Sequence, residues 1–348
     1  MLDAVASGRV DAVQLGALLL LLRAKGETGV ELTALADGLR SRAVRPDIPP
    51  QLRHASGAAP LVDIVGTGGD GHDTINISTA ACVVAAACGA RVVKHGNRSA
   101  SSMSGAADVL EKLGVPMLGP ASIGKCVERA GVCFLFAPTF HPTLVHVASV
   151  RKALGVRTVF NFLGPLLNPA EPKRMVLGVY SPDLMGPYAE AVAAMGAEHA
   201  LIVHCGGLDE LAPVADAAVV RVRDGAVVGA EVLRSDDVGV PRCEIKDLKG
   251  GDAAFNAKFI RGFFAGGPAA DAADAVHIVR TVALNAGAVL HVSGLAADIK
   301  DGYERALACI RGGDALARLD LWASVASSLK REEEEDAAKR AKVGAGGQ

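Results

Sequence analysis

The sequence predicts an α/β fold in which helices flank a mostly parallel sheet, preceded by a small all-helical unit. Two observations carry this prediction: apolar strand and helix patterns alternate along most of the chain, and two helical patterns stand before the first strand. The length of 348 residues is enough for about two domains with a sizeable core. Half of the residues are apolar and aromatic residues are scarce, so small side chains should pack the helices closely on the sheet.

The helical unit comes first. Residues Asp11 to Arg23 and Val30 to Arg40 have the apolar period of two helices, and Gly26 breaks the pattern between them. A Pro- and Arg-rich connection from Ala43 to Pro60 then leads into the first strand, which begins at Leu61. We expect this connection to join the helical unit to the α/β body.

A glycine-rich loop follows the first strand. Residues Gly66 to Gly71 include four glycines in six positions. Such a loop lets backbone N–H groups approach a ligand, because no Cβ stands in the way. Asn76, Ser78 and Thr79 then stand at the start of an apolar helix over residues 80–88. Capping side chains and free N–H groups at a helix N-terminus favour an anion.

Basic residues end the second strand. The strand, Arg91 to Lys94, is followed by His95-Gly96-Asn97-Arg98 and by a Ser-rich loop over residues 99–104. Because parallel strands place their carboxyl ends at one edge of the sheet, the glycine loop, the helix N-terminus and the cations Lys94 and Arg98 should converge there. The sequence therefore predicts a site for a phosphorylated ligand. The alternatives are a plain surface lysine at Lys94 and a hydrogen-bonded structural histidine at His95.

A second glycine loop leads to a pair of carboxylates. An apolar strand over residues 200–204 opens on Gly206-Gly207-Leu208-Asp209-Glu210. Adjacent carboxylates at a strand end supply the hard oxygen ligands that Mg²⁺ prefers. We therefore predict a Mg²⁺ site at Asp209 and Glu210, with the solvated end of a loop as the alternative.

The remaining elements follow from the same periods. Helices are expected over residues 108–113, 123–130, 142–154 and 187–195, and the pattern is helical from Asp252 onward. Strands are expected over residues 114–118, 133–137 and 175–180, and a hairpin joins residues 217–223 to 226–232 around Asp224-Gly225. Phe160 to Pro169 reads as a rigid turn with two prolines. The acidic run Glu332 to Asp336 is either a solvated helix end or a disordered tail.

Charge, hydropathy and cysteine usage exclude several classes of function. The formal net charge is −2, which gives no reason to expect nucleic acid as a partner. The longest apolar runs, Leu15 to Leu22 and Ala80 to Ala90, are too short to span a bilayer, so no membrane partner is expected. The seven cysteines lack metal-ligand spacing and fit buried thiols in a reducing compartment. We expect a cytoplasmic location; targeting by an upstream segment stays open.

Two glycine motifs have other interpretations. Residues 66–71 match the dinucleotide pattern G-x-G-x-x-G, but a Rossmann unit needs an acid where this sequence has Lys94. Residues 119–126 resemble a P-loop, yet Cys126 replaces the Ser or Thr that holds Mg²⁺, which favours an ordinary turn. No nucleophile elbow is present, so acyl transfer has no support. The histidines without metal-ligand spacing are interpreted as structural: His141, His146, His199 and His204.

Six stretches together resemble the anthranilate phosphoribosyltransferase family. They are GTGGD (Gly66–Asp70), NIST (Asn76–Thr79), KHGNR (Lys94–Arg98), VRKALGVRTVFN (Val150–Asn161), LGPLLNP (Leu163–Pro169) and GLDE (Gly207–Glu210). Their order and spacing hold from about Gly8 to Gly312, which is nearly the whole chain. The resemblance implies that the amine of anthranilate attacks C1 of 5-phosphoribosyl 1-pyrophosphate, with Mg²⁺ as cofactor. The products would be phosphoribosyl-anthranilate and pyrophosphate, in tryptophan biosynthesis.

The resemblance also implies a domain organisation of the nucleoside phosphorylase/phosphoribosyltransferase type. Residues 1–58, completed by about 142–166, would form the helical domain. Residues 59–141 and 167–330 would form the α/β catalytic domain, and residues 331–348 an acidic, flexible tail without a counterpart in the family. The family is usually homodimeric, but its first helix, which helps to form the dimer, is not found in this sequence, so the resemblance leaves a homodimer open.

Residue roles are implied at the positions that match the motifs. Donor binding is implied for Gly66, Gly69, Asp70, Thr74, Asn76, Ser78, Thr79, Lys94, His95, Gly96, Asn97, Arg98, Ser101, Ser102 and Ala106. Anthranilate binding is implied for Gly66, Asn97 and Arg151, and metal binding for Ser78, Asp209 and Glu210. These roles agree with the chemistry, because displacement at an anomeric carbon needs a stabilised pyrophosphate leaving group.

Some features depart from the family or admit other functions. Met103 stands where a lysine or arginine is commoner, in a loop expected to close over the donor, which puts donor affinity in question. Arg151 and Lys152 either coat a helix or face the site. A pyrimidine nucleoside phosphorylase is the nearest rival enzyme, but it would give Arg151 and Asn97 no role. A non-catalytic protein that binds a phosphorylated ligand is the rival of another class, and it need not keep the carboxylate pair.

Overall fold

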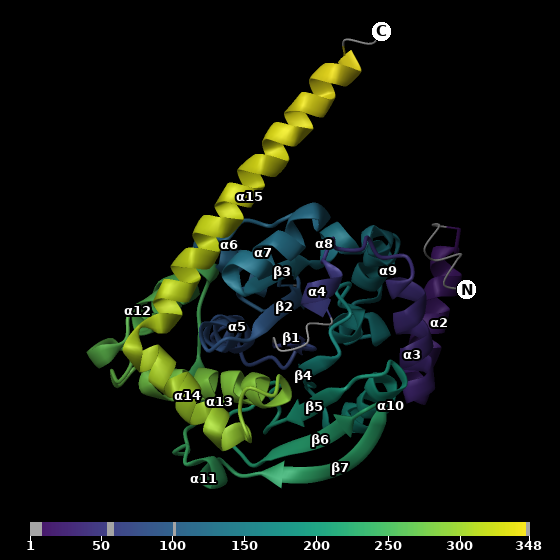
Figure 1. Cartoon of the computed structure of the whole chain (residues 1–348). Helices are drawn as coiled ribbons and strands as arrows, with labels where there is room; N and C mark the ends of the chain where they lie inside the picture. Colours follow the sequence, from purple (N-terminus) through teal and green to yellow (C-terminus); the bar gives the residue numbers. More distant parts are fainter. Residues whose placement is uncertain (1–8, 54–58, 100–101, 346–348) are drawn as a thin grey trace.

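The computed structural model describes residues 9–53, 59–99 and 102–345. Its centre is a seven-stranded sheet in the order β3-β2-β1-β4-β5-β6-β7 (Figure 1). The strands are β1 Leu61–Gly66, β2 Arg91–Gly96, β3 Val132–Phe136, β4 Arg174–Gly178, β5 His199–His204, β6 Ala217–Arg223 and β7 Ala226–Leu233. β1 to β5 pair in parallel, whereas β6 and β7 form an antiparallel hairpin at the edge. The prediction of an α/β fold with a mostly parallel sheet is confirmed.

Helices surround the sheet. The described α-helices are α2 Ala12–Lys25, α3 Gly29–Arg40, α4 Pro50–Arg53, α5 Ile77–Ala87, α6 Ala106–Lys112, α7 Ile123–Ala130, α8 Ala137–Phe140, α9 Val145–Leu154, α10 Met185–Ala194, α11 Ser235–Val238, α12 Ala253–Phe264, α13 Val276–Val292, α14 Ile299–Gly312 and α15 Asp314–Ala345. Short 3₁₀ turns, among them η2 Pro142–Leu144, η3 Val159–Asn161 and η4 Gly164–Leu167, connect several of them.

Two cores lie on opposite faces of the sheet. The larger core joins strand residues such as Val62 and Val92 to the small side chains of α5 and to α13, which are buried nearly throughout. Because alanine and valine dominate α5, this helix can pack close to the strands. The second core joins Leu177 and Ile202 to α10 and to the N-terminal helices. Helices therefore cover both faces, as a parallel sheet requires.

The N-terminal helices pack with a segment that is distant in the sequence. Leu15 and Leu19 of α2 share the second core with Val147 and Val150 of α9, and Leu32 of α3 lies in the same cluster. Thr28 begins α3 with a capping box, in which its hydroxyl accepts from the Glu31 N–H while the Glu31 carboxylate accepts from the Thr28 N–H. These contacts support our proposal that residues 142–166 complete the helical domain.

Two expected elements differ in the structure. The expected strand over residues 114–118 is irregular chain, because Gly114 (φ +85°) reverses the chain after α6 and Pro116 has no N–H for a ladder. The apolar pattern that predicted this strand instead reflects the burial of Val115 and Leu118 in the larger core. The expected helix over residues 142–154 is divided into η2 and α9, since Pro142 begins a 3₁₀ turn.

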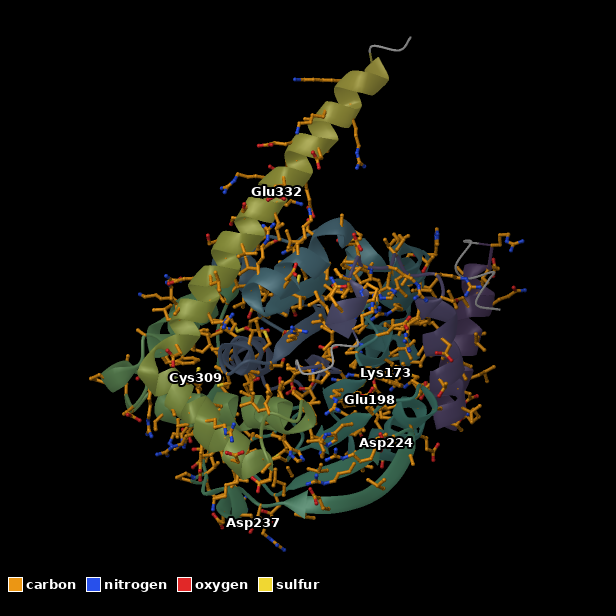
Figure 2. All side chains as sticks on the ribbon, in the orientation of Figure 1. Lys173, Glu198, Asp224, Asp237, Cys309 and Glu332 are labelled. Atoms are coloured by element: carbon orange, nitrogen blue, oxygen red, sulfur yellow. The ribbon has the colours of Figure 1, made fainter. Side chains whose placement is uncertain are left out.

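The acidic tail is helical. Of the two expectations for it, the structure agrees with a solvated helix end and not with a disordered tail. α15 contains 32 residues and is about 48 Å long at 1.5 Å per residue. Its first half is anchored by the fully buried Trp322, and Glu332 lies within ion-pair distance of Lys125 and Arg129 of α7. Beyond this point the helix projects from the body (Figure 1), and Figure 2 labels Glu332 at the point of departure.

The described part of the chain contains no helix long and apolar enough to cross a membrane. All seven cysteines are free thiols, five of them buried and two half-buried, as expected for thiols that pack in the core. The cytoplasmic location stays a prediction.

The crossing of α13 and α14 gives a test of the fold. A Cβ at Gly302 would lie 2.3 Å from the Gly287 carbonyl oxygen, whereas a Cβ at Gly262 of α12 would meet nothing within 4 Å. We expect Gly302→Ala to lower the free energy of unfolding by about 1–3 kcal/mol, because the two helices must separate. Gly262→Ala should raise it by about 0.5–1 kcal/mol through helix propensity. Thermal melting of both variants measures these two changes in stability. Equal melting temperatures for the two variants would contradict the close crossing of α13 and α14.

Candidate active site at the carboxyl edge of the sheet

Three loops meet where β1, β2 and β5 end. The glycine loop follows Gly66, the second loop follows Gly96, and the loop that carries Asp209 and Glu210 follows β5. The edge is opposite to the one marked in Figure 2 by Lys173, Glu198 and Asp224, which lie where β4 and β5 begin and β6 ends. The sequence prediction that these loops converge is therefore correct.

The glycine loop has a backbone that only glycine adopts easily. Gly68, Gly69 and Gly71 have φ of +70°, +77° and +82°. The Gly68 N–H donates to Oδ2 of Asp209 over 2.6 Å. A Cβ at Gly66 would lie 2.2 Å from the same oxygen. Glycines in this loop therefore serve two purposes, the turn itself and the close approach of a carboxylate.

Asp209 and Glu210 connect the glycine loop to helix α5. While Asp209 accepts from the Gly68 N–H, Oε1 of Glu210 accepts from the Ser78 N–H in the first turn of α5 over 3.1 Å. Burial, and after it the carboxylate of Asp70, raise the pKa of Asp209 to about 7. Burial and the neighbouring Asp209 likewise raise the pKa of Glu210 to about 8. The two carboxylates therefore repel one another in a poorly solvated place.

The N-terminus of α5 has an unusual cap. Asn76 stands at the N-cap position but makes no side-chain hydrogen bond to the helix. Its Nδ2 donates instead to the Ser104 carbonyl over 3.2 Å, and its Oδ1 accepts from the Ser104 hydroxyl over 3.1 Å. Asn76 therefore stands at the helix N-terminus as predicted, but its side chain does not cap α5. Thr74, just before it, pairs with Lys249 in an isolated bridge.

Lys94 is buried under the loops. The side chain is 2% exposed, and its Nζ donates to the Ile64 carbonyl oxygen over 2.7 Å. The interpretation as a plain surface lysine is therefore wrong. The buried Asp63 lies nearby, accepts from Nδ2 of Asn168 over 2.7 Å, and has a pKa raised to about 6 by burial, an effect that the charge of Lys94 opposes. Lys94 supplies a fixed positive charge beneath the site.

His95 is a neutral, buried imidazole. Its Nδ1 lies 3.2 Å from the Gly164 carbonyl oxygen, and its ring meets that of His141 edge to face at 5.2 Å between centroids. Burial and the neighbouring His141 lower the pKa of His95 to about 3. Nε2 of His95 and Nδ1 of His141 are buried without a hydrogen-bond partner in the described part of the protein. Among the described residues, each ring therefore keeps one buried nitrogen whose hydrogen-bonding capacity is unused.

The residues after β2 do not all face the site as the sequence predicts. Arg98 forms ion pairs with Asp108 (2.7 Å) and Glu111 (2.6 Å) of α6, so it does not offer the site a free cation as expected. Asn97 accepts from the Arg98 N–H through Oδ1 over 2.7 Å. Gly96 has little space, since a Cβ there would lie 2.9 Å from the ring of Phe134. Ala106 follows as the first residue of α6.

The described end of the Ser-rich loop is held to the segment between the glycine loop and α5. Met103 is 61% exposed, and its N–H donates to Oδ1 of Asp73 over 3.2 Å. The Ser102 hydroxyl and its carbonyl both lie within hydrogen-bond distance of the Ser99 hydroxyl. Ser101, which the sequence assigns to donor binding, lies outside the described residues.

Two arginines, Arg151 and Arg157, come from the segment after α8 that packs with the N-terminal helices. Arg151 of α9 is half-buried, its Nε has no hydrogen-bond partner among the described residues, and burial lowers its pKa. Arg157, which sequence reasoning missed, donates to the Gly69 carbonyl oxygen and lies over the Tyr180 ring at 4.6 Å from the centroid. Arg157 lies within the motif Val150–Asn161, which was the available signal, but its contact with Gly69 spans 88 residues of sequence.

The carboxylate pair fits a hard divalent cation that brings other ligands. No group of three or more His, Cys, Asp or Glu side chains able to hold a metal exists in the ranges described above. Asp209 and Glu210 accept from the N–H groups of Gly68 and Ser78. Among the described residues, neither carboxylate forms an ion pair with a basic side chain. Two carboxylates short of a counter-charge suit Mg²⁺, which usually takes one or two protein carboxylates and completes its shell with water and phosphate.

Comparison with known proteins identifies the family. Residues 58–316 match the model of the glycosyl transferase family, a/b domain, and residues 1–43 that of the helical bundle domain. An anthranilate phosphoribosyltransferase of Shewanella sp. (strain ANA-3) is 42% identical over 324 residues, which cover 93% of this chain and 90% of that protein. The chain belongs to the anthranilate phosphoribosyltransferase family. The helical domain, the α/β domain and the expected family are thereby confirmed.

Solved structures agree. The anthranilate phosphoribosyltransferase of Thermus thermophilus superimposes with a TM-score of 0.83 at 41% identity, over 94% of this chain and 93% of that one. The enzyme from Saccharomyces cerevisiae in complex with PRPP (5-phosphoribosyl 1-pyrophosphate) and Mg gives a TM-score of 0.81 at 28% identity, over 91% and 86%. The chain is accordingly a glycosyltransferase that transfers the phosphoribosyl group of PRPP to anthranilate in tryptophan biosynthesis. The nucleoside phosphorylase and non-catalytic interpretations are therefore rejected.

The raised pKa values of the carboxylate pair predict how stability depends on pH. The unfolded chain loses these two protons near the ordinary values of 3.8 and 4.5, whereas the folded chain keeps them until about 7 and about 8. The free-energy cost of burying the two ionised carboxylates therefore grows as the pH rises from about 4 to about 8, and it is constant at higher pH. Asp209→Asn, Glu210→Gln removes this cost but keeps oxygens for both N–H groups.

We expect the double variant to match the parent protein at about pH 4 and to be more stable by about 2 kcal/mol or more at about pH 9. Melting curves without Mg²⁺ over this range measure the difference. A difference that does not change with pH would show that the carboxylates are solvated.

Proposed function

We propose that PRPP binds between the glycine loop and the N-terminus of α5, with anthranilate on the side of α9. The observation that carries this proposal is the link made by Asp209 and Glu210. Asp209 accepts from the Gly68 N–H of the glycine loop, and Glu210 accepts from the Ser78 N–H at the start of α5, so the carboxylate pair holds these two elements together. Oriented N–H groups at a glycine loop and at a helix N-terminus are suited to phosphate oxygens. The buried charge of Lys94 adds to this field.

The donor-binding residues are those of the matching motifs. On this proposal, those that lie in or after β1 and β2 bind the donor: Gly66, Gly69, Asp70, Thr74, Asn76, Ser78, Thr79, Lys94, His95, Gly96, Asn97, Ser102 and Ala106. Arg98 acts indirectly in this proposal, because its ion pairs to Asp108 and Glu111 fasten the loop after β2 onto α6. Ser101 keeps its assignment from the motif alone.

Ser78, Asp209 and Glu210 would hold Mg²⁺ that arrives with the donor. The yeast relative was solved in complex with PRPP and Mg, and the oxygen donors here are of the type that Mg²⁺ prefers. When bound, the cation neutralises charge on the departing pyrophosphate. The protein contributes the fixed position of the two carboxylates, which the Gly68 and Ser78 N–H groups hold and which form no ion pair with a basic side chain of the described residues.

Anthranilate would lie against Arg151, Asn97 and Gly66. The guanidinium of Arg151 is half-buried, and its Nε has no partner among the described residues, so it suits the planar carboxylate of anthranilate through a two-pronged hydrogen bond. The aromatic amine is neutral and nucleophilic at neutral pH, so no strong general base is required. Holding the amine in line with C1 of the donor supplies much of the rate enhancement. No residue of this chain needs to form a covalent intermediate.

Turnover against Mg²⁺ concentration tests the reaction and the metal assignment together. We expect anthranilate fluorescence to fall when the protein is mixed with PRPP, anthranilate and Mg²⁺. Asp209→Asn, Glu210→Gln should lower kcat by ~10–100-fold and shift the Mg²⁺ dependence to higher concentration. Superimposable Mg²⁺ curves for the two proteins would place the metal elsewhere. Phosphorolysis of a pyrimidine nucleoside, used as a second assay, should be absent.

Replacement of Arg151 tests the anthranilate site. Loss of a desolvated carboxylate partner costs about 2 kcal/mol or more, so Arg151→Ala should raise KM for anthranilate by ~30-fold or more and change KM for PRPP little. Lys152→Ala is the matched control, since Lys152 is the exposed neighbour on the same helix. A rise in KM for PRPP instead of anthranilate, or equal effects of the two substitutions, would refute the assignment.

A homodimer stays part of the proposal. α2 is apolar on most of its surface, and Val13, Leu20 and Leu21 are 79%, 42% and 69% exposed. A helix that is apolar all round is ordinarily buried, so a second copy covering α2 would explain this surface.

A further inference from the structure

Asn256 reaches the donor-binding edge from helix α12, 180 residues after Asn76. It is 1% exposed, and its Nδ2 donates to Oδ1 of Asn76 and to the Ser104 hydroxyl, both over 2.8 Å. The Ser104 hydroxyl donates to the same Asn76 oxygen over 3.1 Å. The side-chain amide of Asn256 thus forms hydrogen bonds both to the residue that precedes α5 and to the Ser-rich loop.

These hydrogen bonds occupy the oxygen with which Asn76 would otherwise cap α5. An N-cap asparagine normally accepts from the N–H of the second or third helical residue, here Ser78 or Thr79. In this protein Oδ1 of Asn76 points to Asn256 and Ser104, and the Ser78 N–H donates to Glu210. Over the described ranges, the Thr79 N–H makes no hydrogen bond, although Thr79 is buried. A helix N–H without an acceptor therefore stays available for a ligand.

The orientation of the Asn256 amide is fixed by its other contacts. Its Oδ1 accepts from the Gly251 N–H over 2.8 Å, which leaves Nδ2 to donate. Gly250 packs directly on the amide, since a Cβ there would lie 2.8 Å from Oδ1. The loop before α12 is itself held to the glycine-loop side, because the Gly250 N–H donates to the Asp73 carbonyl over 2.9 Å. Asn256 therefore presents hydrogen-bond donors to Asn76 in one defined arrangement.

We propose that Asn256 is a positioning residue for PRPP: it holds the side chain of Asn76 away from α5 and so keeps the Thr79 N–H free for a phosphate oxygen. This inference rests on the proposed donor site. Without Asn256, the Asn76 oxygen can turn to cap Thr79, as N-cap asparagines usually do. The donor would then have to displace an internal hydrogen bond before binding.

Titration calorimetry with PRPP and Mg²⁺ tests the proposal, using the parent protein, Asn256→Ala and Asn256→Leu. Leucine keeps most of the volume of the side chain and removes its donors, so it stands in if the alanine variant does not fold. We expect both variants to raise Kd for PRPP by ~10-fold, the effect of a competing hydrogen bond. KM for PRPP should rise in parallel, while KM for anthranilate stays unchanged.

Asp252→Ala is the matched control. Asp252 caps the same helix, accepting from the Phe255 N–H over 2.8 Å, but it is exposed and, among the described residues, forms no hydrogen bond with Asn76. It should lower the melting temperature without changing Kd for PRPP. If Asp252→Ala weakens PRPP binding as much as Asn256→Leu, or if neither Asn256 variant weakens it, Asn256 serves only the stability of α12 and the inference is wrong.

A second comparison shows whether Asn256 acts through Asn76. In an Asn76→Ala background, Asn256→Ala should change Kd for PRPP no further, because the side chain that it restrains is gone. Additive effects of the two substitutions would overturn the proposed route. If the parent protein itself fails to bind PRPP, the proposed donor site is wrong, an outcome that is distinct from an unchanged Kd in the variants.

Discussion

The site depends on how closely the Asp209 loop approaches the ends of β1 and β4. A Cβ at Gly178 would lie 1.6 Å from the Asp209 carbonyl oxygen, and one at Gly66 would lie 2.2 Å from its carboxylate. The absence of side chains at both strand ends lets the loop cross the sheet, so that Oδ2 reaches the Gly68 N–H. From there the next residue, Glu210, reaches α5. One backbone approach therefore sets the glycine loop, the carboxylates and the helix N-terminus relative to one another.

Local patterns were enough to predict the elements of this edge. Glycine spacing, the apolar period of α5 and the strand that ends at Gly96 all predict the convergence, because a parallel sheet brings strand ends together. The prediction of a strand over residues 114–118 was wrong, because its apolar residues are buried in the core without joining the sheet. Pro116 has no N–H to donate to a neighbouring strand. The tail was ambiguous, since its acidic run favours solvent whether or not it is helical, and only contacts such as Glu332 with Lys125 decide its course.

Side-chain partners far apart in the sequence were beyond such patterns. Arg98 looks like a phosphate-binding cation, yet α6 lies close enough for Asp108 and Glu111 to bind it. Arg157 and Asn256 reach the site across 88 and 180 residues, and no local spacing reports such contacts. Residue type could be inferred from the sequence; the competition among hydrogen-bond partners could not, because it depends on how the loops pack.

The charge balance of the edge suggests why donor and cation should bind together. Asp63, Asp209 and Glu210 lie around Lys94, whose charge opposes the rise in the pKa of each. With all three carboxylates ionised, one lysine cannot balance them, and Arg98 is already paired. An anionic pyrophosphate would therefore meet excess negative charge beside its N–H donors. Mg²⁺ held by Asp209 and Glu210 would reduce this repulsion, because it prefers carboxylate and phosphate oxygens alike. On the proposed assignment, the same repulsion that raises the pKa values of Asp209 and Glu210 makes the affinity for PRPP depend on the cation.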